Sequence, residues 1–253
     1  GLEALTLSVP PTPGHSIVKR PDNTHLFTVG EVFKQAGYEP LYLYGGYGYF
    51  DNMTTFFAGN DYTVIDRTAL KAEEVHFENV WGVADEDLYT LRELDRRHAA
   101  GVKFFAHVMT TSNHRPFTYP EGRIDIPSKT GRDGGVKYTD WAIGNFIERA
   151  RSRPWFADTV FVIVADHTHK GRGRQELPPE NYHIPLIIFA PAHVKPGRVE
   201  TLASQIDVAP TVLGLLNFSY RSKFFGHDIL REGQRHPRAL MANYQTVGYY
   251  EQG

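Results

Sequence analysis

The most informative stretch of the chain is "VFVIVADHTHKGRG", residues 160–173, where an apolar run ends abruptly on polar groups. Six apolar residues, Val160 to Ala165, are followed at once by Asp166 and His167. His169 comes next, with Lys170, Arg172 and Arg174 spaced by glycines. A short apolar run of this kind is typical of a buried strand. The sequence therefore predicts a strand that ends on a carboxylate and an imidazole, beside a cationic loop.

Outward from this stretch, apolar strands alternate with amphipathic helices. Strands are predicted over 39–46, 103–114, 158–167 and 183–191. Helices are predicted over 26–37, capped by Asn23 or Thr24, over 85–101, closed by Gly101, over 136–150, and over 208–218, capped by Asp207. This alternation is typical of an α/β fold with a mostly parallel sheet covered by helices on both faces.

Polar residues follow three of these predicted strands. They are Gly45 and Gly46 after the first, 112–114 after the second, and 166–167 after the third. Ligands of open α/β sheets bind beyond the carboxyl ends of the strands. We therefore expect an active site at that edge of the sheet.

Composition narrows the function classes. The 253 residues are 41% hydrophobic and 22% charged, and no low-complexity stretch divides them, so a single domain over 1–253 is predicted. The formal charge of -2 offers no general attraction for nucleic acid or an anionic membrane. The absence of cysteine excludes disulfides and thiolate ligands, so that any metal must be bound by histidine and carboxylate.

The chain shows no apolar run of the roughly 20 residues that span a bilayer, and no signal peptide. We expect this segment to be soluble. It also lacks an initiator methionine, and we expect it to be a fragment of a longer protein.

Asp166 and His167 are the first metal-ligand candidates. Carboxylate oxygen and imidazole nitrogen suit Mn²⁺, Zn²⁺ or Mg²⁺, and a strand end would hold them rigidly. The alternative is an ordinary turn with a surface histidine. His183, before the strand over 183–191, either caps that strand or returns to the same metal centre.

Three residues are candidates for substrate binding. His114 and Arg115, in "TTSNHRPF", suit a phosphate or sulfate oxygen, although Asn-His-Arg-Pro is also a plausible turn. His169, with the basic loop after it, would balance an anionic substrate.

Two further segments have less chemistry. Residues 45–51, "GGYGYFD", fit neither the dinucleotide template nor a P-loop. They form either a substrate-side loop whose tyrosines stack on a sugar or a packed aromatic turn. Asp207 is interpreted as a helix cap without chemistry.

Taken in order, these pieces resemble the sulfatase-like phosphoglycerol transferases of the alkaline phosphatase superfamily, the lipoteichoic acid synthase-like group. The matching stretches are "FKQAGYEPLYLYGG" (33–46), "SNHRPF" (112–117), "VFVIVADHTHKGRG" (160–173), "HIPLIIFAP" (183–191) and "SQIDVAPTVLGLL" (204–216). The resemblance implies an α/β/α sandwich, a divalent metal and a threonine nucleophile that forms a covalent phospho-enzyme.

On this resemblance, Asp166 and His167 bind the metal, and His114 matches the substrate histidine. His183 matches a histidine of the related lipid A phosphoethanolamine transferases, which can serve a second zinc there. Mn or Zn is expected, with Mg or Ca as alternatives. The family's metal-binding glutamate, first strand and nucleophilic threonine precede a "GLEAL"-like segment, which here is residues 1–5. All three are therefore expected upstream of residue 1, and the fragment is expected to be nearly inactive. Thr6 and Thr12 are poor substitutes for the nucleophile.

The chain also departs from the family. The family has a tryptophan and an arginine in the loop where this chain has Asp51, Asn52 and Met53. This difference argues against glycerolphosphate as the substrate more than against the type of reaction. The expected substrate is an anionic phosphodiester or sulfate ester, and nucleic acid is not expected. The intact protein is expected at the periplasmic or extracellular face of a bacterial membrane, anchored by N-terminal helices. A sulfatase or phosphodiesterase, and a non-catalytic binding module, are the alternatives.

Overall fold

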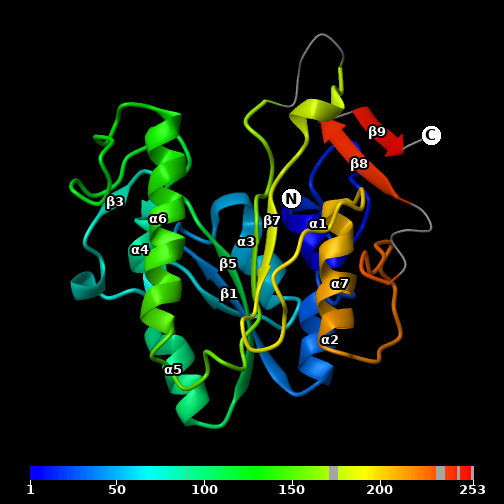
Figure 1. The fold of residues 1–253 in the computed structure, drawn as a ribbon, viewed down its shortest axis with the longest axis horizontal. Helices are drawn as coiled ribbons and strands as arrows, with labels where there is room; N and C mark the ends of the chain where they lie inside the picture. Colours follow the sequence, from blue (N-terminus) through cyan, green and yellow to red (C-terminus); the bar gives the residue numbers. More distant parts are fainter. Residues whose placement is uncertain (90, 171–175, 232–236, 244–245, 252–253) are drawn as a thin grey trace. The chain divides into compact units, whose positions relative to one another are not determined.

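The computed structural model describes residues 1–253 except 90, 171–175, 232–236, 244–245 and 252–253 (Figure 1). The chain divides into two compact units. We call residues 33–157 the central unit, and residues 1–32 with 158–253 the split unit. The single domain predicted over 1–253 is not tested by this division and stays a prediction.

The central unit contains a three-stranded parallel sheet in the order β2 (Thr63–Ile65), β1 (Tyr38–Tyr44), β5 (Lys103–Met109). In the middle strand, Leu41 pairs with Thr63 on one side and Ala106 on the other. Residues 40–44 are all buried. A strand that is buried on both faces reads as a near-continuous apolar run, which is why β1 is recognisable in the sequence.

Helices and short strands complete the central unit: α3 (Met53–Ala58), β3 (Glu78–Asn79), β4 (Gly82–Val83), α4 (Asp85–Leu88), α5 (Leu91–Ala99) and α6 (Arg132–Ala150). The α4 and α6 helices contact each other, and Tyr138 of α6 stacks on Tyr119 in a buried cluster. Gly101 follows α5 with a φ of +70°, and thereby ends the helix as predicted.

The split unit holds two antiparallel strand pairs, β6 (Phe161–Val164) with β7 (Leu186–Phe189), and β8 (Arg238–Asn243) with β9 (Thr246–Glu251). Its helices are α1 (Leu2–Leu7) and α7 (Val208–Leu215), which contact each other (Figure 1). The mostly parallel arrangement predicted from the apolar strands holds for β2, β1 and β5, whereas β6 and β7 pair antiparallel.

Every predicted helix differs from the observed one at one end or both, and two of these differences have a visible cause. The first, α2 (Val29–Gln35), begins later than predicted because the Thr28 hydroxyl accepts the backbone N–H of Glu31 at 3.0 Å and caps it. Asn23, one of the predicted caps, instead donates to the carbonyl oxygen of Val18. The helix predicted over 85–101 is two helices, α4 and α5, and Tyr89 between them has a non-helical ψ of 58°.

Candidate functional site

The Asp166 and His167 side chains lie together just beyond the end of β6. One Asp166 oxygen accepts the backbone N–H of His167 at 2.8 Å, and the other lies 3.3 Å from His167 Nε2. The two side chains are 55% and 76% exposed, so a ligand can reach both. The strand end thus places a carboxylate oxygen and an imidazole nitrogen side by side.

The protonation of His167 tells which nitrogen can bind a metal. His167 Nδ1 lies 2.8 Å from the carbonyl oxygen of Thr168, and because a carbonyl can only accept, Nδ1 carries the hydrogen. In the neutral ring Nε2 then presents a lone pair toward the Asp166 carboxylate. Two ligands of one tetrahedral metal, each about 2.1 Å from it, lie about 3.4 Å apart. The observed 3.3 Å separation therefore fits a shared divalent metal.

His183 and His169 lie in two segments that run close to the end of β6. Because β6 and β7 are antiparallel, with Val164 opposite Leu186, the segment before β7 begins beside the end of β6. The Thr168 hydroxyl donates to the carbonyl oxygen of Asn181, which ties the two segments together. His183 and His169 are both exposed.

Within the described residues, however, no three histidine or acidic side chains come close enough to bind one metal. His183 is thus not brought to the Asp166–His167 pair, and its role as a ligand stays a prediction. Lys170 is described and exposed, whereas Arg172 and Arg174 of the predicted basic loop lie outside the described residues.

Two contacts that the sequence did not reveal hold the strand end in place. The Gln205 amide donates to the carbonyl oxygens of Ala165 and Asp166, each at 2.8 Å. Gly1 packs so closely that a Cβ there would lie 2.3 Å from the Asp166 carbonyl oxygen. The backbone that precedes α1 is therefore positioned at the Asp166–His167 pair.

The two threonines that the sequence offers near the N-terminus have other roles. Thr6, in α1, is fully buried. Thr12 is exposed, and its hydroxyl accepts a hydrogen bond from Arg20. A buried hydroxyl cannot reach a substrate.

His114 and Arg115 lie in the central unit, in the turn after β5. His114 is exposed, and its ring packs on Trp81 with a centroid distance of 4.0 Å. The Asp85 carboxylate, fully buried in α4, accepts the backbone N–H groups of Thr111 and Ser112 at 3.0 Å each. The expected convergence of this turn with Asp166 stays a prediction.

Residues 45–51 form an ordered loop in the central unit. Gly48 N–H donates to Asp66 at 2.7 Å, and the Tyr47 hydroxyl donates to Glu78 at 3.1 Å. Tyr49 is 80% exposed, so its ring is accessible to a ligand. Gly46 packs against the backbone of Trp81, where a Cβ would lie 2.5 Å from the carbonyl oxygen.

Asp207 stands at the predicted start of a helix, but its carboxylate has other partners than the helix. Its side chain makes no capping hydrogen bond to α7, although α7 begins directly after it. Instead it accepts the backbone N–H groups of Ser204 and His227 and binds the Arg238 guanidinium. The predicted helix start is confirmed, whereas the side-chain cap is not, because Arg238, distant in sequence, binds both carboxylate oxygens.

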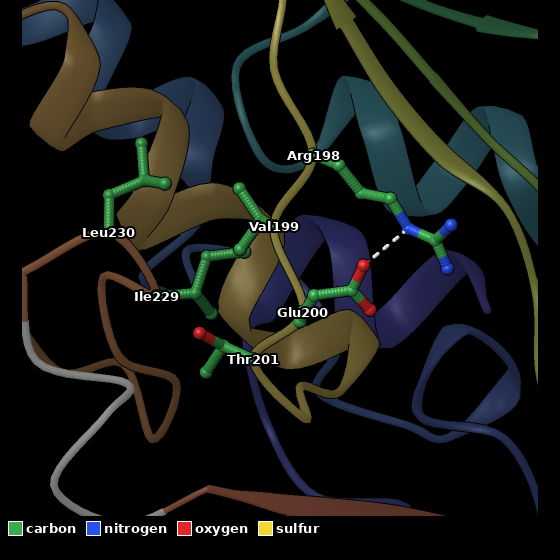
Figure 2. A pocket seen from close by; sticks show the side chains of 6 residues that line it. All are labelled: Arg198, Val199, Glu200, Thr201, Ile229 and Leu230. Atoms are coloured by element: carbon green, nitrogen blue, oxygen red, sulfur yellow. Dashed lines mark ion pairs between the residues drawn. The ribbon is translucent and has the colours of Figure 1, made fainter.

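A pocket of about 370 Å³ lies elsewhere in the split unit (Figure 2). It is lined by Arg198, Val199, Glu200, Thr201, Ile229 and Leu230. Figure 2 shows the exposed Arg198–Glu200 ion pair on one side of Val199, with Leu230 on the other. None of the predicted site residues lines this pocket.

The fold is that of the alkaline phosphatase superfamily. A protein of that superfamily from Vibrio parahaemolyticus matches with a TM-score of 0.90 and 34% identity, over 98% of this chain and 62% of that one. The lipoteichoic acid synthase LtaP from Listeria monocytogenes shares the fold, with a TM-score of 0.81 and 22% identity over 95% of this chain and 64% of that one.

The Sulfatase family model matches residues 2–218, and the chain belongs to this family. Lipoteichoic acid synthase 1 from Bacillus subtilis is 24% identical over 80% of this chain and 34% of its own length. Phosphoglycerol transferase I from Xanthomonas campestris pv. campestris is 27% identical over 80% of this chain and 30% of its own length. The resemblance inferred from the sequence is confirmed, and the chain spans about a third of these relatives.

Proposed function

We propose that the chain is part of a metal-dependent phosphoryl transferase that acts on an anionic phosphodiester, such as glycerolphosphate or a phospholipid head group. The observation that carries this proposal is the 3.3 Å separation of the Asp166 carboxylate and His167 Nε2 at an exposed strand end. The names of the curated relatives, a lipoteichoic acid synthase and a phosphoglycerol transferase, supply the substrate class.

Asp166 and His167 would bind the divalent metal, Mn or Zn, with His183 as a further ligand. A bound metal of this kind neutralises charge on the phosphoryl oxygens and activates a nucleophile. His114, Arg115 and His169 would contact the substrate oxygens, since imidazolium and guanidinium donate charge-assisted hydrogen bonds to phosphate.

The nucleophile would be a threonine upstream of residue 1. Its hydroxyl oxygen forms a bond to phosphorus as the bond from phosphorus to the leaving oxygen breaks, and the proton that the hydroxyl gives up is matched by the one that the leaving alcohol takes up. An acceptor alcohol then attacks the same phosphorus and releases the threonine. The packing of Gly1 against Asp166 supports this assignment, because it places the residue before α1 beside the metal-ligand pair.

We propose that the intact protein works at the outer face of a bacterial membrane, anchored by helices upstream of this chain. Among the helices that the structure describes, none combines the length and apolar character needed to cross a bilayer. The proposed location rests on the cell-envelope products named for the relatives, not on this observation.

The test uses the full-length protein with a glycerolphosphate-bearing lipid and a sulfate ester as alternative substrates. Asp166→Asn should lower kcat/KM for the lipid by about 100-fold or more. Loss of a residue that only hydrogen-bonds to a metal ligand already lowers activity by about 10- to 100-fold, and loss of the ligand itself should lower it at least as much. Asp158→Asn is the matched control, since Asp158 is 90% exposed and lies 4.0 Å from His193 in a second Asp–His pair. Equal activity of the two variants would refute the metal site.

The same site on a hydrolase is the second candidate, favoured by the family model itself. Water would then replace the acceptor alcohol. Preferential cleavage of the sulfate ester would establish this alternative and overturn the transferase. Robust turnover by residues 1–253 alone would show that the nucleophile lies within the chain.

A further inference from the structure

The indole of Trp81 and the imidazole of His114 form a packed pair. Their centroids lie 4.0 Å apart with the planes tilted by 50°. Trp81 is half-buried and also contacts Phe50 edge-on at 5.5 Å, whereas His114 is exposed. The partly buried ring therefore supplies a fixed wall for the exposed one.

One carbonyl oxygen joins the two rings. The carbonyl oxygen of Arg115 accepts the indole N–H of Trp81 and lies 3.0 Å from His114 Nδ1. A carbonyl can only accept, so Nδ1 carries its hydrogen, and Nε2 is the nitrogen left to contact a ligand. The indole hydrogen bond therefore fixes the position of the Arg115 carbonyl oxygen, and this oxygen keeps the hydrogen on His114 Nδ1.

Trp81 is itself held by its neighbours. Its backbone N–H donates to the Asn79 side chain at 2.8 Å, and the Asn79 amide donates to the Thr118 hydroxyl at 2.8 Å. Thr118 is buried and follows the His114 turn in sequence. The indole is thus tied to both sides of the turn that carries His114.

Asp85 fixes the start of the same turn. Its buried carboxylate accepts the N–H groups of Thr111 and Ser112 at 3.0 Å and the Thr139 hydroxyl at 2.9 Å. In return the Ser112 hydroxyl accepts the Asp85 N–H at 3.1 Å. Three hydrogen bonds therefore fasten residues 111–112, just before His114, to Asp85 of α4, and a fourth ties Asp85 to α6.

We propose that Trp81 and Asp85 are positioning residues for His114. Asp85 fixes the backbone of the turn, and Trp81 fixes the orientation of the imidazole with Nδ1–H on the Arg115 carbonyl oxygen. Nε2 then faces the substrate, and in the imidazolium form its hydrogen is donated to a substrate oxygen. The inference rests on the proposed function only in taking His114 as a substrate-binding residue.

The first experiment needs no substrate. In NMR spectra of residues 1–253 at a pH of about 8.5, well above the ordinary imidazole pKa of about 6.5, His114 should be mainly the Nδ1–H tautomer. Its signals are assigned by their loss in His114→Gln. In Trp81→Leu the His114 ring protons should move, because the indole ring current is gone. Trp81→Phe keeps an aromatic face but cannot donate to Arg115, so the excess of the Nδ1–H form should fall.

Trp141→Phe is the matched control, because Trp141 lies in α6 and stacks on Tyr138. It should leave the His114 signals unchanged. For Asp85, the amides of Thr111 and Ser112 should lose protection from hydrogen exchange in Asp85→Ala and keep part of it in Asp85→Asn, whose amide oxygen still accepts. Unchanged His114 signals in Trp81→Leu, or unchanged exchange in Asp85→Ala, would overturn the inference.

The second experiment uses the full-length enzyme. Trp81→Phe should raise KM about tenfold with little change in kcat, because it disturbs a group that binds the substrate. A change in kcat alone would contradict this positioning role. If His114→Gln leaves kcat/KM unchanged, the substrate role of His114 fails, whereas the NMR result still decides the positioning of the ring.

Discussion

Asp207 and Arg238 form a two-point ion pair in the interior of the split unit. The guanidinium donates to the two carboxylate oxygens at 2.6 and 2.8 Å, and the side chains are 2% and 10% exposed. Arg238 begins β8, beyond residue 218, where the match to the Sulfatase family model ends. The pair therefore binds the C-terminal hairpin to the part of the chain that the family shares.

Removing one partner of this pair should destabilise the chain strongly. Arg238→Met leaves a buried carboxylate without its counter-ion, and we expect the free energy of unfolding in urea to fall by about 3–5 kcal/mol. Arg198→Ala, which breaks the exposed ion pair with Glu200, should change it by less than about 1 kcal/mol. A loss below about 1 kcal/mol in Arg238→Met would contradict the structural role of the pair.

His107 should make the fold sensitive to acid. It lies in β5 with its ring 5.6 Å from the rings of Tyr42 and Phe57, and burial lowers its pKa to about 4. The unfolded chain, with an ordinary imidazole pKa of about 6.5, binds this proton more tightly. The contribution of His107 to stability is therefore complete above pH 6.5 or so and is lost as the pH falls through about 4.

In His107→Leu, the free energy of unfolding should fall less steeply between pH values of about 6.5 and 4 than in the wild type. The slope of that free energy against pH should decrease by an amount that corresponds to at most one bound proton. The comparison is of slopes, because the substitution also changes packing. His98→Leu, at an exposed position of α5, should keep the wild-type slope. Parallel pH profiles for His107→Leu and the wild type, from urea unfolding, would refute the assignment.

Asp85 should have the opposite effect on the pH dependence of stability, because its contribution is lost as the pH rises. Burial raises the pKa of its carboxyl group above the ordinary value of 3.8, against the lowering effect of its hydrogen-bond donors. The stability linked to its neutral form is present below pH 3.8 and is lost as the pH rises through the raised pKa. Asp85→Asn cannot ionise, so its stability relative to the wild type should increase as the pH rises above 3.8 and through the raised pKa. A difference that does not vary with pH would contradict this.

Metal binding at Asp166 can be measured without turnover. In residues 1–253, calorimetric titration should show weak affinity for Mn²⁺ or Zn²⁺, because Asp166 and His167 supply only two of the roughly four ligands that such a site needs. Asp166→Ala should abolish the binding and leave the unfolding free energy within about 0.5 kcal/mol, since its side chain is half exposed. Unchanged affinity would mean that the Asp–His pair is an ordinary turn.

Local pattern was sufficient to predict the strands β1 and β5, the stop signal at Gly101 and the alternation of helices with apolar strands. It also singled out the Asp166–His167 pair, because a carboxylate directly after an apolar run is visible in the sequence. Backbone propensity and the periodic placement of apolar residues act over a few neighbouring positions, so they can be recognised without a partner.

Tertiary structure decided every feature that depends on a partner distant in the chain. It pairs β6 with β7 antiparallel, gives Asp207 an ion-pair partner 31 residues away, and sets Trp81 against His114. A carboxylate or an indole binds whichever donor or ring the folded chain brings within reach. That partner follows from the folded path of the chain as a whole, and no local window of sequence contains it.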